Sequence, residues 1–147
     1  MRLANKFDIP QIIEMLKEYR SAAPIEILNQ ANDKEYVEQL LSNLIAGSGF
    51  IVVAEKNNIL IGMLIAAIFP NIWNPKVNQC SEIAYWVKPE HRGGTAAYRL
   101  IKEYTKECDK LIKIGRIQIS TISKMVNSPD LKYNKFGFSK LEETWCK

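Results

Sequence analysis

A turn of small residues at positions 92–97 is the segment of this sequence best suited to binding an anion. Its residues are Arg92, Gly93, Gly94, Thr95, Ala96 and Ala97. The turn follows the apolar run that ends at Val87 and opens a long helical pattern. The first amide groups of a helix have no carbonyl partner within the helix, and the peptide dipoles make that end partly positive. Because glycine and alanine leave the backbone accessible, a phosphate can approach closely, and we predict a pyrophosphate-binding turn.

Helical patterns precede this turn in the chain. Capping signatures at 8–11 and 32–35 each begin an apolar stripe with helical spacing. These stripes predict one helix to about Arg20 and a second to about Ile45. The segment 21–29 between them has no clear period, so we expect a loop there that borders a substrate pocket.

Apolar runs predict the strands of a sheet. The runs at 50–54 and 59–69 are rich in β-branched residues and predict a hairpin, and their lack of alternation indicates that both faces of the sheet are covered. The runs at 81–87 and 117–122 flank a third helical stripe that ends at Gly115. They predict two parallel strands joined by a crossover helix, with the turn of small residues at the start of that helix.

The end of the chain and the composition complete the expected architecture. We predict a short helix at 128–133 and a last strand at 139–146. The chain has 147 residues, of which 47% are hydrophobic, and it contains no internal repeat or linker. We therefore expect one α/β domain over residues 1–147, with a single well-buried core.

Composition also disfavours several classes of protein. The net charge is +4, but lysine and arginine are spread along the chain, unlike the basic blocks of nucleic-acid-binding tails. Cys80, Cys108 and Cys146 lie far apart, and His91 is the only histidine, so we expect neither a metal site nor a disulfide framework. The sequence shows no apolar leader and no run long enough to span a bilayer, so we expect a cytoplasmic protein without a membrane partner.

Two motifs carry a resemblance to a known family, namely Pro89-x-x-Arg92-Gly93 after a strand and Tyr133-x-x-x-Gly137-Phe138 near the end. Together with the order of helices and strands, they resemble the GNAT family of acyl-CoA-dependent N-acetyltransferases over nearly the whole chain. The variant Arg-Gly-Gly-Thr-Ala is similar to that of acetyltransferase-like proteins carried by bacteriophages. The resemblance implies an α/β (α+β) fold with a mixed, mostly antiparallel sheet, a central pair of splayed parallel strands, and helices on both faces.

The resemblance also implies a binding site for acetyl-CoA. Residues 92–97 would hold the pyrophosphate, and Val87 would pair with the pantetheine and point its N–H at the thioester carbonyl. Asn127 lies near the position of a family asparagine that contacts pantetheine, and Tyr133 matches the tyrosine that protonates the departing thiolate. Thr95 replaces the central glycine of the family motif Arg/Gln-x-x-Gly-x-Gly/Ala, which threonine can do if residue 95 lies in a first helical turn.

Transfer to an amine requires a base, because an ammonium ion has no lone pair with which to attack a thioester. Glu82 lies on the strand that leads into the turn, where many members of the family place a carboxylate, and burial there would raise its pKa. In a regular strand Glu82, Ala84 and Trp86 share one face. A bulge would shift that register, and the sequence leaves both arrangements open.

The expected activity is transfer of an acetyl group from acetyl-CoA to a primary amine by direct attack in a ternary complex, without a metal. The acceptor would be a small molecule, such as a polyamine or amino sugar, or an amine of a peptide or protein. A homodimer is compatible with the sequence. One alternative is a non-catalytic acyl-CoA-binding regulatory or interaction protein with the same fold. A nucleic-acid-binding protein is disfavoured, because the aromatic residues are not interleaved with a basic stripe.

Overall fold

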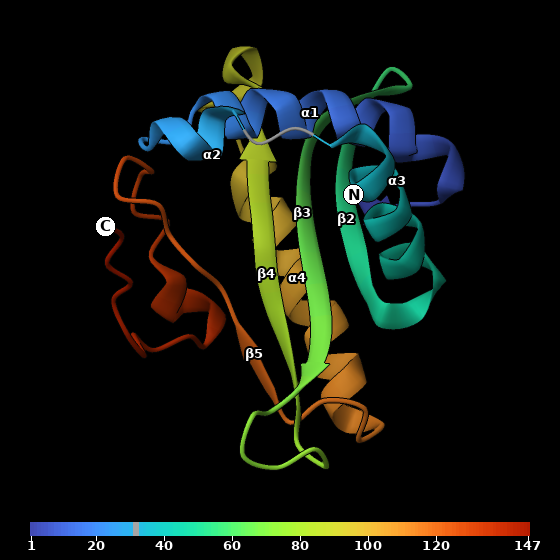
Figure 1. Cartoon of the computed structure of the whole chain (residues 1–147), viewed down its shortest axis with the longest axis vertical. Helices are drawn as coiled ribbons and strands as arrows, with labels where there is room; N and C mark the ends of the chain where they lie inside the picture. The colour runs from blue at the N-terminus through green and yellow to red at the C-terminus, as the bar shows by residue number, and fades with distance from the viewer. Residues whose placement is uncertain (31–32) are drawn as a thin grey trace.

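A five-stranded sheet forms the centre of the computed structural model, which describes residues 1–30 and 33–147 (Figure 1). The strands, in their spatial order, are β1 (Arg2–Leu3), β2 (Gly49–Lys56), β3 (Ile59–Pro70), β4 (Asn78–Val87) and β5 (Ile119–Thr121). The α-helices are α1 (Ile9–Ser21), α2 (Glu26–Gln30), α3 (Lys34–Asn43) and α4 (Ala96–Lys113). Neighbouring strands are antiparallel except for β4 and β5, which are parallel. This is the mixed, mostly antiparallel sheet that the sequence predicts.

Helices cover both faces of the sheet, as the continuous apolar strands indicate (Figure 1). On one face α1 and α3 pack against the sheet through a buried cluster that includes Ile12, Leu41, Ile65 and Ala84. On the other face α4 packs through a cluster that includes Leu100. Because both faces are buried, strands β2 and β3 can be apolar at nearly every position.

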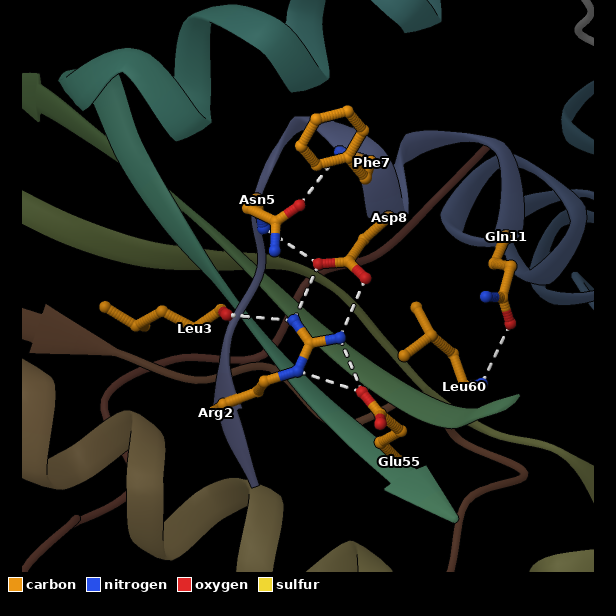
Figure 2. Close-up of polar contacts among 8 residues, drawn as sticks. All are labelled: Arg2, Leu3, Asn5, Phe7, Asp8, Gln11, Glu55 and Leu60. Atoms are coloured by element: carbon orange, nitrogen blue, oxygen red, sulfur yellow. Dashed lines mark hydrogen bonds and ion pairs between the residues drawn. The ribbon is translucent and has the colours of Figure 1, made fainter. Parts of the chain in front are cut away.

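The predicted hairpin of β2 and β3 is confirmed, and its turn consists of Asn57 and Asn58. Both have positive φ angles, of 53° and 63° respectively. A two-residue turn with positive φ at both positions matches the twist of the strands, and asparagine adopts that conformation readily. At the start of β3, Gln11 of α1 accepts a hydrogen bond from the backbone N–H of Leu60 at 2.9 Å (Figure 2). This bond fixes the position of α1 along the sheet.

Strand β1 was not predicted, and it changes the role of the first capping signature. The guanidinium of Arg2 lies between the carboxylates of Asp8 and Glu55 (Figure 2), with N–O distances of 2.7 and 2.9 Å to Asp8. Asp8 also accepts from the backbone N–H of Asn5 at 2.8 Å. The hydrogen bond from Arg2 holds the pKa of Asp8 below its ordinary value. Asp8 precedes α1 as expected, but its side chain caps the preceding turn instead of α1.

Helix α2 begins within the predicted loop 21–29 and ends one residue beyond it, so that prediction is wrong over its second half. The side chains of Glu26 and Gln30 are hydrogen-bonded at 2.9 Å across one helical turn, which favours the helix. Helix α3 begins after Asp33, whose carboxylate accepts from the N–H of Tyr36 at 3.0 Å. Asn32 of the predicted capping signature lies outside the described residues.

Two predictions for the end of the chain are wrong. The predicted helix 128–133 is absent from the described structure, and a short 3₁₀ helix, Tyr133–Phe136, begins where it should end. Lys132 has a left-handed conformation with a φ of 54°, which a continuous helix cannot contain. The described residues 139–146 form no strand. Strand β5 offers an edge of only three residues, too short to hold a strand of that length.

Candidate active site

Strands β4 and β5 lie side by side over only three residue pairs and then separate. The last pair is Ser81 with Thr121, whereas β4 continues to Val87. The chain beyond β5 turns away from β4 (Figure 1). The backbone of β4 from Glu82 onward therefore has no strand partner on this side within the described residues. This is the splayed parallel pair that the family resemblance implies.

Glu82 is the first residue of β4 beyond this point of separation. Its side chain is 8% exposed, and its Oε2 atom accepts a hydrogen bond from the backbone N–H of Ser123 at 3.0 Å. Burial raises the pKa of Glu82 from 4.5 to about 7, and the N–H of Ser123 opposes part of that rise. A carboxyl with this pKa is partly ionised near neutral pH, so it can both accept and release a proton.

A bulge at Ile83 decides which face of β4 Glu82 occupies. Ala84 pairs with Ile65 and Glu82 pairs with Ala66, so Ile83 is an extra residue in β4. Ala66 packs on the α4 side of the sheet and Ala84 packs on the side of α1 and α3. Glu82 and Ala84 are therefore on opposite faces by register, so of the two arrangements that the sequence leaves open the structure has the bulge.

The charge of Glu82 acts on three tyrosines, and the sequence predicted a role for only one of them. Burial and then the charge of Glu82 raise the pKa of both Tyr19 and Tyr133. Burial, followed by Tyr133 and Glu82, raises the pKa of Tyr85. The Tyr85 hydroxyl is buried and has no hydrogen-bond partner among the described residues. Tyr85 can be recognised as a residue of this site only from the bulge, because the bulge places Tyr85 on the same face of the sheet as Glu82.

The N–H of Val87 points away from β3. Lys88 donates its N–H to the carbonyl of Ile61 at 3.0 Å, and neighbouring residues of an antiparallel strand alternate between facing the partner strand and facing away. Val87 therefore directs its N–H and C=O to the side from which β5 has separated. Its carbonyl accepts a hydrogen bond from Nε of Arg92 at 2.9 Å. The guanidinium carbon of Arg92 lies 4.3 Å from the centre of the Trp86 ring. Arg92 thus ties the turn to the end of β4.

The turn itself presents free backbone at the start of α4. Thr95 has φ −92° and ψ −1°, so threonine is accommodated without strain at this position. Gly93 has φ +80°, which favours glycine, and a Cβ atom at Gly93 or Gly94 would meet no atom within 4 Å in the described structure. Thr95 makes no side-chain capping hydrogen bond there. The open backbone and uncapped amides are suited to an anion such as a pyrophosphate.

The structure does not bring Asn127 into this cluster through any hydrogen bond in the described part of the chain. Asn127 is exposed, in a turn closed by a hydrogen bond from the N–H of Ser128 to the carbonyl of Met125 at 3.0 Å. Its contact with pantetheine stays a prediction. Among the described residues, there is no group of three or more His, Cys, Asp or Glu side chains arranged to bind a metal. The same residues include no helix long and apolar enough to cross a membrane.

Comparisons with known proteins agree with this fold. The model of the acetyltransferase (GNAT) family matches residues 10–138. A predicted acetyltransferase from Clostridium acetobutylicum, solved with acetyl-CoA, has a TM-score of 0.74 and 18% identity over 99% of this chain and 92% of that chain. The ribosomal-protein-alanine N-acetyltransferase from Brucella melitensis biovar Abortus 2308 has a TM-score of 0.64 and 18% identity over 99% of this chain and 96% of that chain. An aminoglycoside acetyltransferase from an uncultured soil metagenomic sample has a TM-score of 0.67 and 13% identity over 99% of this chain and 91% of that chain. No curated protein matches the chain.

Proposed function

The chain belongs to the GNAT acetyltransferase family, and from that premise we propose that it transfers an acetyl group from acetyl-CoA to a primary amine by direct attack in a ternary complex. The observation that carries the proposal is the separation of β4 from β5 immediately beside the buried carboxyl of Glu82. We propose a cytoplasmic protein in which residues 1–147 form one domain.

Acetyl-CoA would bind along the open side of β4. The amides of residues 93–97 would hold the pyrophosphate, where glycine leaves room and the helix dipole favours negative charge. Arg92 would keep the turn in place through its bond to Val87 and its stacking on Trp86. The exposed Asn127 would contact the pantetheine. The buried hydroxyl of Tyr85 would donate to the same part of the coenzyme and so gain a partner.

The reaction needs one proton acceptor and one proton donor. Glu82 would take a proton from the ammonium form of the acceptor, and the free amine would then attack the thioester carbon. As the new C–N bond forms, the N–H of Val87 would stabilise the negative charge on the carbonyl oxygen. The C–S bond would then break, and Tyr133 would protonate the departing thiolate. The nitrogen of the new amide would lose its second proton, which would return to the Tyr133 oxygen through water, and Glu82 would release its proton to solvent between turnovers.

A thiol-release assay with acetyl-CoA and a panel of primary amines tests this proposal. We expect release of free CoA that depends on an added amine, together with thermal stabilisation by acetyl-CoA and CoA but not by an oligonucleotide of random sequence. Stabilisation by the coenzymes without release from any amine would favour the non-catalytic alternative. The absence of both effects would contradict the proposal.

A further inference from the structure

A second feature lies on the opposite face of β4 from α4. It is an apolar pocket of about 250 Å³ between α1, α3 and strands β3 and β4. Its apolar lining includes Leu16 of α1, Leu41 of α3, Ile65 of β3, and Ile83 and Ala84 of β4. An apolar cavity of about 150 Å³ is enough to bind benzene, so this pocket can accept a group of that kind.

The pocket adjoins the proposed reaction centre. Its residues Ile83 and Ala84 directly follow Glu82 in β4, and the bulge turns them away from the α4 side. Tyr19 also lines the pocket and lies close enough to Glu82 for that carboxylate to raise its pKa. The ring of Tyr19 meets the ring of Trp86 edge to face at 6.1 Å. The carboxyl of Glu82 itself faces the α4 side, so a molecule in this pocket would reach it past Tyr19, around the edge of β4 that β5 leaves open.

The charges at the pocket do not suit a polycation. Asp33 is the single carboxylate among the described residues that line it, and this carboxylate already accepts the N–H of Tyr36. Lys17, Arg20 and Lys34 also line the pocket, and Lys17 is paired with a glutamate of α1 at 2.6 Å. Polyamines and amino sugars with several ammonium groups need several carboxylates, because each desolvated cation must be paired. Burial of an apolar group needs no such partner.

We infer that the acceptor is a primary amine carrying a branched aliphatic or aromatic group, which enters this pocket while the amine lies at Glu82. This inference rests on the proposed function. It selects hydrophobic amines, including the N-terminal amine of a peptide that begins with a large apolar residue, over polyamines and amino sugars. The pocket residues determine specificity, and Glu82 serves every acceptor alike.

Amino-acid amides test the inference, because they present the same α-amine with different side chains. We expect kcat/KM for leucinamide and phenylalaninamide to exceed that for glycinamide by at least about tenfold, since a single methylene in an apolar pocket gives about that discrimination. Spermidine should be the poorest acceptor. Equal values for glycinamide and leucinamide, or a preference for spermidine, would overturn the inference and leave the proposed function intact. Failure of every amine to release CoA would contradict the proposed function itself.

A matched pair of substitutions locates the preference in the pocket. Leu16 and Leu111 are both partly buried leucines, one in the pocket lining and the other packed with α4 on the opposite face of the sheet. Leu16→Phe should raise KM for leucinamide at least about tenfold and leave KM for acetyl-CoA unchanged, whereas Leu111→Phe should change neither. Ile83→Ala provides a second test at a position that is 42% exposed and tolerant of change. It should lower kcat/KM for leucinamide but not for glycinamide, and equal effects on both amides would overturn the inference.

Discussion

Replacing Glu82 by glutamine separates the cost of burying this carboxyl from its proposed use as a base. Its pKa is about 7 in the folded protein and 4.5 as the ordinary value, so the unfolded chain releases this proton at lower pH than the folded chain does. Below pH 4.5 the carboxyl is neutral in both states and does not change the free energy of unfolding. Between pH 4.5 and 7 the folded state loses stability relative to the unfolded state, and above pH 7 the full loss of roughly 3 kcal/mol remains. Glutamine carries no charge at any pH and avoids this loss.

Chemical denaturation at pH 5 and pH 8.5 measures the effect. The free energy of unfolding of Glu82→Gln should exceed that of the unchanged protein by less than about 1 kcal/mol at pH 5 and by roughly 3 kcal/mol at pH 8.5. At the higher pH the melting temperature should rise by about 6 to 12 °C. The matched control, Glu142→Gln, replaces an exposed carboxylate and should change stability little at either pH. A stability gain that is the same at both pH values, or a loss at pH 8.5, would refute the reasoning.

The same variant should lose activity in a way that depends on pH. A protein that uses Glu82 as its base should gain rate up to about pH 7 and then level off, because the carboxylate is then fully ionised. The variant depends on acceptor that is already deprotonated, and this fraction grows about tenfold per pH unit up to the pKa of the amine. The rate of the unchanged protein divided by that of the variant should therefore be constant below pH 7 and fall above pH 7. A ratio that stays constant to pH 9 would remove Glu82 from the proton transfer.

Four further substitutions test other parts of the site. Tyr133→Phe should lower kcat about 100-fold while the Kd for acetyl-CoA, measured by calorimetry, stays unchanged, and an unaltered kcat would contradict its assignment as the thiolate acid. Gly94→Ala should leave the melting temperature unchanged and raise the Kd for acetyl-CoA about tenfold, whereas Gly93→Ala should also cost about 1 to 2 kcal/mol of stability because its φ is +80°. Equal Kd values for Gly94→Ala and the unchanged protein would place the pyrophosphate elsewhere. Tyr85→Phe should raise the free energy of unfolding by up to about 1 kcal/mol, because the buried hydroxyl has no partner in the described structure, and a decrease on denaturation would contradict that.

Much of the fold could be predicted because it follows from local patterns. The apolar runs of β2 and β3 alternate little, which indicates burial on both faces, and helices do cover both faces. The turn at Asn57 and Asn58 could be predicted because asparagine readily adopts the positive φ that both positions have. The crossover connection between β4 and β5 could be predicted from the long apolar stripe of α4. In each case the information lies within a short stretch of sequence.

The arrangement around Glu82 depends on contacts that no local pattern contains. The bulge at Ile83 arises from the register of β4 against β3, and it moves Glu82 to the face of Tyr85. The buried hydroxyl of Tyr85 and the closeness of Tyr19 to Glu82 follow from that register and from the packing of α1. Neither residue can be recognised from the alternation of β4 alone. The unpaired segment 139–146 is a similar case, because it depends on how early β5 ends.

A crystal structure with bound acetyl-CoA is the most direct test of the proposed acetyl transfer. The thioester carbonyl oxygen should lie about 2.7 to 3.1 Å from the backbone nitrogen of Val87, and the pyrophosphate should lie at the amides of residues 93–97. The carboxyl of Glu82 should face the acetyl group from the point where β4 and β5 separate. Acetyl-CoA bound away from the open side of β4, or with its thioester remote from Glu82, would contradict the proposal.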